Sequence, residues 1–218
     1  SMGEILILLD AVKEHFIFCL SFIGILTAIQ VLNMASGNIF LILGIIPRKW
    51  YGLPGILFSP FLHGGFTHLL FNSLPMLVLM NVLLLKGYLH FFLISSQIAV
   101  LGGILTWFFG RPAIHVGASG LVLGYMGYFI MAWYFDQTPL NTVILLVLLY
   151  YIGGILMGLM PDDPGVSWEG HVFGFFAGLV SSLMQTYPMH VPSKLVWALS
   201  APGYWLYTVL RDHVSFLS

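Results

Sequence analysis

The chain has 218 residues, of which 59% are apolar and only 7% are charged, a balance that excludes an ordinary soluble globular domain. The formal net charge of −1 excludes a basic surface for nucleic acid, and the one cysteine excludes a disulfide framework or a cysteine-based metal site. We therefore expect a multi-pass integral membrane protein that binds no nucleic acid.

Six apolar segments are long enough to cross a bilayer, which needs about 20 apolar residues in each helix. They cover roughly residues 16–34, 68–85, 88–109, 116–135, 139–160 and 167–187. Glycine, proline and charged residues separate them, as is typical of turns between helices. The sequence therefore predicts an all-α fold, a bundle of six transmembrane helices. The first segment lacks a small-residue cleavage site, so we expect it to be retained as a span.

The connection between the first two predicted helices, from about residue 35 to 67, is the only long one. Its mixture of aromatic, basic and proline residues suits the headgroup region of a bilayer, so we expect this first loop to be membrane-associated. The apolar pattern weakens after Pro188, and residues 188–218 are expected to form an interfacial C-terminal tail. No fixed repeat or long linker interrupts the chain, so residues 1–218 are expected to form a single domain with its core at about 16–187.

Four polar residues stand near the starts of three predicted helices. His68 and Asn72 begin the second helix, Ser119 begins the fourth, and His171 begins the sixth. Polar side chains are unfavourable in hydrocarbon, so their presence indicates a function carried out within the bilayer. In an up-and-down bundle these three helices run in the same direction, and their N-terminal ends share one side of the membrane. We therefore expect the four residues to lie at one depth.

The residue types at these positions fit nucleophilic catalysis. A serine hydroxyl needs a neighbouring base to take its proton, and His171 can serve Ser119 in this role. Attack on a peptide bond creates an oxyanion, which the Ser119 backbone N–H and the side chains of His68 and Asn72 can stabilise. None of the acidic residues lies in the middle of a span, and Glu169 is expected to point away from His171. The pattern predicts a Ser-His dyad without a carboxylate.

Glycines surround the candidate catalytic residues and recur every four positions along the sixth predicted helix. They are Gly117 and Gly120 beside the serine, and Gly170, Gly174 and Gly178 in the sixth helix. Small residues at this spacing let membrane helices approach closely. We therefore expect the helix that carries His171 to pack directly against the helix that carries Ser119.

Three segments together resemble the motifs of the rhomboid intramembrane serine proteases. They are FLHGGFTHLLFN at residues 61–72, GASG at residues 117–120 and GHVFG at residues 170–174. Their order and spacing agree with that family, and the resemblance extends over roughly residues 16–187. It implies a six-helix fold, substrates that are single-span transmembrane proteins, and no metal or other cofactor.

The resemblance also implies a role for each motif residue. Ser119 corresponds to the nucleophile, His171 to the general base, and His68 and Asn72 to the oxyanion donors. His63 matches a family histidine with a structural role near the first loop. Gly117, Gly120, Gly170 and Gly174 correspond to the glycines that support these motifs.

Two positions depart from the family's pattern. Some members have a Trp-Arg pair in the first loop where residues 48–50 here read Arg-Lys-Trp, which leaves the packing of that loop open. Some members stack an aromatic residue, four positions after the serine, on the base histidine, but that position is Leu123 here. The side chains that could hold His171 instead are Phe173, Phe175 and Tyr125.

Other functional classes fit less well. A membrane-embedded zinc protease needs a motif such as H-E-x-x-H, which the sequence lacks. A secondary transporter should have internal repeats and polar residues near the midplane, whereas the polar cluster here lies on one side. We expect an intramembrane serine endopeptidase of a prokaryotic inner membrane. The alternative is a catalytically silent rhomboid-like protein that binds transmembrane segments, and the oligomeric state is left open.

Overall fold

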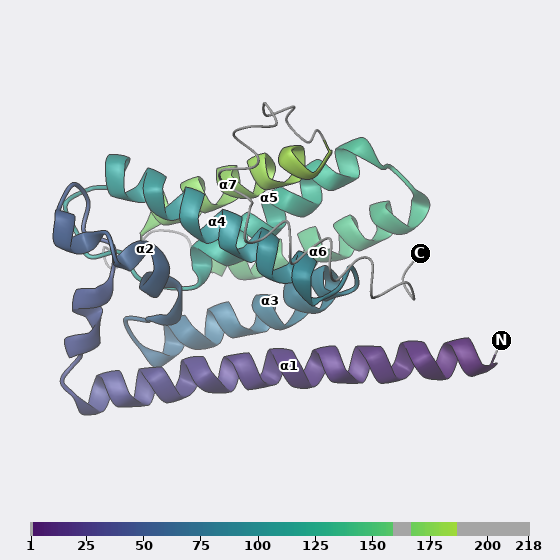
Figure 1. Cartoon of the computed structure of the whole chain (residues 1–218), viewed down its shortest axis with the longest axis horizontal. Coiled ribbons are helices and arrows are strands. Elements are labelled where there is room, and N and C mark those ends of the chain that lie inside the picture. Colours follow the sequence, from purple (N-terminus) through teal and green to yellow (C-terminus); the bar gives the residue numbers. More distant parts are fainter. Residues whose placement is uncertain (1, 159–166, 187–218) are drawn as a thin grey trace, which may run out of the picture. The chain divides into compact units, whose positions relative to one another are not determined.

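The computed structural model describes residues 2–158 and 167–186, and these residues are mostly helical (Figure 1). The long helices among them are α1 (Met2–Ala35), α3 (Phe66–Leu84), α4 (Tyr88–Phe109), α5 (Ser119–Phe135), α6 (Pro139–Gly158) and α7 (Trp168–Thr186). Short helical turns join α1 to α3: η1 (Ile39–Leu43), η2 (Trp50–Gly52), α2 (Gly55–Phe58) and η3 (Ser59–Phe61). The predicted all-α fold is confirmed.

The helices follow the predicted segments closely except at the start of the chain. Helix α1 begins at Met2 rather than near residue 16. Residues 4–15 include charged side chains but no glycine or proline. The helix formed by the apolar segment can therefore extend through them towards the N-terminus. By internal contacts the chain divides into residues 1–183 and 184–218, and all the long helices except the last turn of α7 belong to the first unit.

The number of membrane spans is only partly supported. By length and composition, three described segments are long and apolar enough to cross a bilayer: Leu9–Ala35, Phe66–Leu84 and Tyr88–Phe109. Helix α5 and the segment Asn141–Tyr150 of α6 are apolar but shorter. The count of six spans therefore stays a prediction, and the predicted tail at 188–218 lies outside the described residues.

Helix α3 lies at the centre of the first unit, where it contacts α1, α4, α5 and α6. Its core face consists of Met76, Leu79, Met80 and Leu83, all fully or almost fully buried. Helix α1 runs along one side of α3 (Figure 1). This central placement matters for the site, because the first two turns of α3 carry His68 and Asn72.

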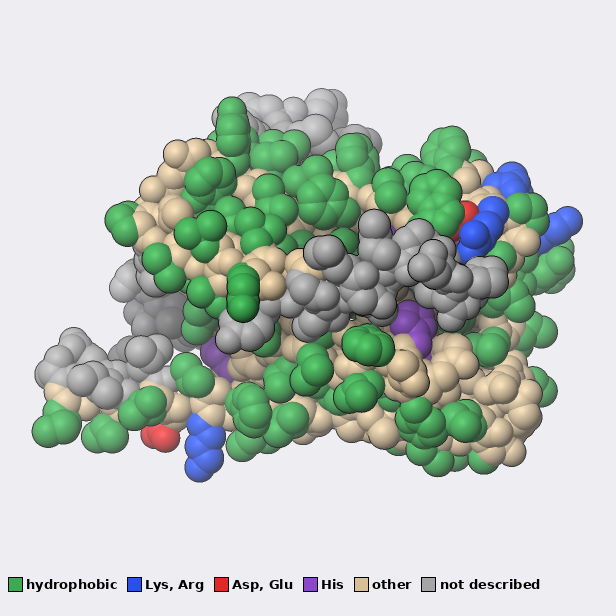
Figure 2. Space-filling model, turned by 180° about the vertical axis from the view of Figure 1, so that it is seen from behind, with side chains coloured by type: hydrophobic (Ala, Val, Ile, Leu, Met, Phe, Trp, Pro, Cys, Tyr) green, Lys and Arg blue, Asp and Glu red, His purple; other side chains and the backbone are tan. Residues whose placement is uncertain are grey.

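The outer surface of the helices is apolar as well as their core. Figure 2 shows apolar side chains spread over much of the visible face, with charged side chains confined to small groups. Exposed examples include Leu89 and Phe92 on α4 and Leu146 on α6. A soluble monomer rarely exposes apolar surface on this scale, whereas a helix in lipid requires it. The surface therefore indicates an integral membrane protein.

The segment between α1 and α3 is hydrogen-bonded to the C-terminal end of α4. The Arg48 guanidinium donates hydrogen bonds to the carbonyl oxygens of Phe108 (3.0 Å) and Gly110 (2.8 Å). The indole N–H of Trp107 donates to the carbonyl oxygen of Lys49 at 2.9 Å. A cation at a helix C-terminus satisfies carbonyls that lack helical partners and interacts favourably with the helix dipole. Arg48 thus settles how the loop packs, although its association with the membrane stays a prediction.

Candidate active site

Ser119 is the first residue of α5 and lies at the floor of a small cavity, with only 5% of its surface exposed. Gly117, two residues earlier, has a φ of +123°, a conformation that residues with a side chain rarely adopt. A Cβ atom at Gly117 would also lie 2.9 Å from the His68 ring. The glycine is therefore required both for the turn into α5 and for the approach of His68.

The segment before Ser119 is held in place by the loop between α1 and α3. The Gly117 N–H donates to the carbonyl oxygen of Ser59 at 2.9 Å, and the Ala118 N–H donates to Nε2 of His63 at 3.3 Å. Ile45 and His115 exchange two backbone hydrogen bonds, each of 2.9 Å. His63, for which a structural role was predicted, thus makes a hydrogen bond to the serine motif itself.

His63 acts as a neutral acceptor in this contact. Burial, together with the neighbouring His68, lowers the pKa of His63 to about 3. The unprotonated Nε2 can then accept from the Ala118 N–H at any pH near neutrality. The His63 and His68 rings meet edge to face, with their centroids 5.4 Å apart.

His68 lies against the serine motif, and Asn72 projects from the same face of α3 four residues later. A point beside Gly117, where a Cβ would stand, is 3.4 Å from Nε2 of His68 and 3.6 Å from Oγ of Ser119. Asn72, one turn further along α3, is 1% exposed, and among the described residues neither its amide nitrogen nor its amide oxygen has a hydrogen-bond partner. Buried amides are rarely left unpaired, so an unpaired one is a candidate for binding a transient group.

His171 is the fourth residue of α7 and lies near the same cluster. It interacts electrostatically with His68 and with Glu169. Its Nε2 atom is buried and, among the described residues, has no hydrogen-bond partner, so no hydrogen bond joins it to Ser119. Catalytic hydrogen bonds are often long before substrate binds, and this atom is free to accept a proton.

Glu169 is bound elsewhere. Its carboxylate accepts a hydrogen bond from the Arg111 backbone N–H at 3.4 Å and forms an ion pair with the Arg111 side chain at 3.5 Å. It makes no hydrogen bond to His171 within the described structure. Glu169 therefore does not act as a carboxylate partner of His171 in this structure.

The glycines bring α7 against α5 at backbone contact. A Cβ atom at Gly174 would collide with the Gly120 carbonyl oxygen, and one at Gly178 would collide with the Gly124 carbonyl oxygen. No side chain can be accommodated there without moving the helices apart. The close packing expected from the glycine spacing is present, and it sets the distance between the helices that carry Ser119 and His171.

The side chains proposed to hold His171 have other contacts. The Tyr125 hydroxyl pairs with the Ser95 hydroxyl at 2.7 Å, and the Phe173 ring packs 6.2 Å from the Phe109 ring, measured between centroids. Neither contact involves the His171 ring. The third candidate, Phe175, packs against the hydrophobic core.

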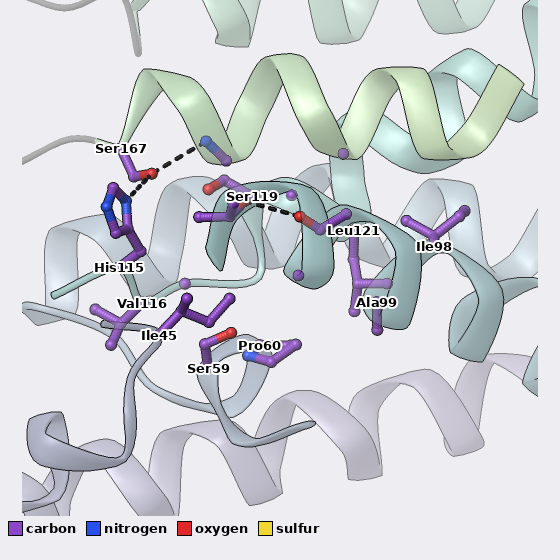
Figure 3. Close-up of a pocket in the computed structure, with 17 residues that line it drawn as sticks. Ile45, Ser59, Pro60, Ile98, Ala99, His115, Val116, Ser119, Leu121 and Ser167 are labelled. Atoms are coloured by element: carbon purple, nitrogen blue, oxygen red, sulfur yellow. Dashed lines mark hydrogen bonds between the residues drawn. The ribbon is translucent and has the colours of Figure 1, made fainter. Parts of the chain in front are cut away.

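A cavity of about 50 Å³ opens beside Ser119 (Figure 3). Its polar side chains come from Ser119, His115, Ser167, Ser59 and Thr106. His115 and Ser167 lie side by side in its wall, with Nδ1 of His115 and Oγ of Ser167 2.6 Å apart. Sequence reasoning missed this pair because neither residue belongs to a motif. The available signal was position, since His115 precedes Ser119 by four residues and Ser167 precedes His171 by four.

Comparison with known proteins places this architecture in a family. Residues 47–187 match the Rhomboid domain. The chain is 36% identical to Uncharacterized protein Rv1337 of Mycobacterium tuberculosis over 193 residues, which cover 84% of this chain and 79% of that protein. It is 28% identical over 149 residues to a Bacillus subtilis protein named Putative rhomboid protease YdcA, covering 65% of this chain and 70% of that one.

A plant protein is also similar, although over a smaller share of its length. RHOMBOID-like protein 4 of Arabidopsis thaliana is 34% identical over 121 residues, which cover 55% of this chain and 30% of that protein. The domain match spans more than half of the chain, so the protein belongs to the rhomboid family. Membership supports an intramembrane protease type of function, and the bacterial relatives point to a prokaryotic membrane.

Proposed function

We propose that the protein is an intramembrane serine endopeptidase that cleaves single-span transmembrane proteins. Ser119 is the nucleophile, His171 is the general base, and six helices cross the membrane. The proposal is supported by three observations: Ser119 lines a cavity, the His68 ring lies against Gly117 two residues before the serine, and the Asn72 amide on the same helix as His68 is buried and unpaired within the described structure.

In the first half of the reaction, Oγ of Ser119 attacks the carbonyl carbon of the substrate peptide bond while Nε2 of His171 takes the hydroxyl proton. The carbonyl oxygen becomes an oxyanion. The Ser119 N–H, at the start of α5 where helical amides lack partners, and the side chains of His68 and Asn72 donate to it. The intermediate then collapses, the C–N bond breaks, and His171 returns the proton to the leaving amine.

In the second half, water hydrolyses the acyl-enzyme. His171 takes a proton from the water, the hydroxide adds to the ester carbonyl, and the same donors stabilise the second oxyanion. Collapse releases the carboxylate product and restores the Ser119 hydroxyl with the proton held by His171. No cofactor is needed for this sequence of steps.

Cleavage of a reporter with one transmembrane helix, in liposomes, tests the proposal. Ser119→Ala and His171→Ala should each lower the rate by about 10⁴-fold or more, because the members of a catalytic dyad act as a unit. A fluorophosphonate should label Ser119 in the natural protein and fail to label Ser119→Ala. Cleavage that survives either substitution would refute the assigned roles.

One observation favours the alternative of a catalytically silent protein that binds transmembrane segments. Within the described residues, Ser119 and His171 are not hydrogen-bonded to each other. If that separation persisted when substrate binds, proton transfer would be slow. Reporter binding without cleavage and without fluorophosphonate labelling would support this second function.

A further inference from the structure

Two residues outside the recognised motifs join the serine-bearing segment to the start of the histidine-bearing helix. His115 is only 4% exposed, and its Nδ1 lies 2.6 Å from Oγ of Ser167. Its other ring nitrogen, Nε2, lies 3.0 Å from the carbonyl oxygen of Arg111. Both nitrogens therefore have a partner, and the ring bridges residues 111 and 167.

The partners fix the direction of each hydrogen bond. A carbonyl oxygen can only accept, so Nε2 of His115 carries the proton and donates to Arg111. Nδ1 is then the acceptor and receives the Ser167 hydroxyl proton. The lone pairs of the Ser167 oxygen remain available, and one accepts from the Gly170 backbone N–H at 3.1 Å.

Ser167 is thus the N-cap of α7 as well as the partner of His115. It immediately precedes Trp168, the first residue of the helix, and satisfies the N–H of the third. The His171 N–H donates to the Ser167 carbonyl oxygen at 3.3 Å, so the histidine lies one helical turn beyond the cap. Any rotation of the first turn of α7 about its axis would move Ser167 and His171 together.

A second contact reinforces the same junction. Arg111 and Glu169 form an ion pair of 3.5 Å, and the carboxylate also accepts from the Arg111 N–H at 3.4 Å. The loop before α5 therefore holds the first turn of α7 at residues 167 and 169. Glycine packing sets how far apart α5 and α7 lie, but it does not by itself fix rotation or sliding along the helix axis.

We propose that the His115–Ser167 hydrogen bond is the positioning device of the active site, which sets the rotation of α7 and with it the direction of the His171 ring towards Ser119. The inference rests on the proposed function and assigns two positioning residues to it. Each lies four residues before the catalytic residue on its own segment. A displacement of about 1 Å at a reacting group can cost 100-fold in rate, so the pair can matter without touching the substrate.

The test uses paired variants of the full-length protein in liposomes. Ser167→Ala removes the cap and the bond to His115, and we expect kcat to fall by about 10-fold to 100-fold with KM unchanged. Ser167→Thr retains the hydroxyl and should stay within about threefold of the natural kcat. Ser181→Ala is the matched control, because the Ser181 hydroxyl is buried on the same helix and has no hydrogen-bond partner among the described residues.

Variants at His115 distinguish the contributions of its two hydrogen bonds. In His115→Asn the amide oxygen can replace the Nδ1 acceptor, whereas in His115→Gln the amide nitrogen can replace the Nε2 donor. If the bond to Ser167 is the one that positions α7, His115→Asn should retain more kcat than His115→Gln. The rate of fluorophosphonate labelling at Ser119 should follow the same order, and thermal unfolding should show that all variants are folded.

The outcomes are distinguishable. A natural kcat in Ser167→Ala and His115→Gln, with Ser119→Ala inactive, overturns the inference and leaves the proposed function standing. A raised KM with unchanged kcat also overturns it, because the pair would then be contacting substrate. Labelling at Ser167 would make that serine the reactive one. A natural protein that neither cleaves reporters nor reacts with fluorophosphonate refutes the proposed function and this inference together.

Discussion

The two ends of α5 offer an instructive comparison. At the Ser119 end the cavity is only about 50 Å³. Asn72 on α3 and His171 on α7, two helices that pack against α5, have buried polar atoms without partners in the described structure. At the Asp136 end the cavity is about 240 Å³. There His90 pairs with Tyr128 at 3.0 Å, and the Asn141 amide donates to Asp136.

The difference shows that cavity size is a poor guide to chemistry in this protein. Polar atoms that satisfy one another stabilise the fold and have little left to offer a substrate. Unpaired donors and acceptors cost stability and are retained where a transient charge needs them. The smaller cavity is therefore the better candidate for the active site.

The largest effect is expected at the α5–α7 contact. Gly178→Ala would place a methyl group against the Gly124 carbonyl oxygen, so the helices must separate and the site should lose its activity. We also expect a loss of about 1–3 kcal/mol in unfolding free energy. Gly24→Ala on α1 is the control, since nothing lies within 4 Å of its added Cβ. Retained cleavage in Gly178→Ala would show that the close packing is dispensable.

Asn72 and Asn141 allow an unpaired amide to be compared with a paired one. Asn72→Ala should lower kcat by about 100-fold or more through loss of an oxyanion donor. Its thermal stability should change little, because the amide makes no hydrogen bond in the described structure. Asn141 donates to the Asp136 carbonyl at 2.9 Å, and Asn141→Ala should leave kcat within about twofold. Equal losses in the two variants would abolish the contrast between the ends.

We expect His63 to make the protein less stable in acid. Its folded-state pKa of about 3 lies below the usual 6.5, so the unfolded chain binds more protons between these values. Stability from this group is therefore complete above about pH 6.5 and declines as pH falls towards 3. His63→Gln, which keeps an acceptor for the Ala118 N–H, should flatten the dependence of melting temperature on pH below 6.5. An unchanged slope would contradict the assignment.

The smallest effect is expected at the opposite end. Tyr128→Phe removes the hydroxyl that meets His90 and should cost about 1 kcal/mol of stability, the usual worth of one hydrogen bond. Reporter cleavage should be unchanged within experimental error. A large loss of kcat in this variant would indicate that the larger cavity takes part in the reaction.

Much of the fold was predictable because bilayer physics leaves strong signals in sequence. Apolar segments of helical length located α3, α4 and α5 to within three residues at each boundary. The start of α1 was not predicted. Apolar composition marks the part of a helix that can lie in lipid, but it does not show how far the helix continues outside the lipid. The short helical turns between α1 and α3 were missed for a related reason, since they are held by distant partners such as the α4 carbonyls bound to Arg48.

The candidate site, like the fold, was predictable only in part. The motifs singled out Ser119 and His171 because few residue types can do their chemistry, and glycine spacing indicated which helices would touch. The roles of these residues stay predictions until the substitutions are measured. His115 and Ser167 could not be found this way, because a histidine and a serine 52 positions apart have no local pattern that reveals their contact.

The sequence by itself determined that the protein is helical, apolar and suited to a membrane, because these properties follow from composition and from the period of the helix. It also indicated the candidate residues of the site. Only the tertiary structure decided which polar atoms are satisfied and which are left unpaired, because that depends on contacts between segments far apart in the chain. The His115–Ser167 bond and the unpaired Asn72 amide both belong to this second class.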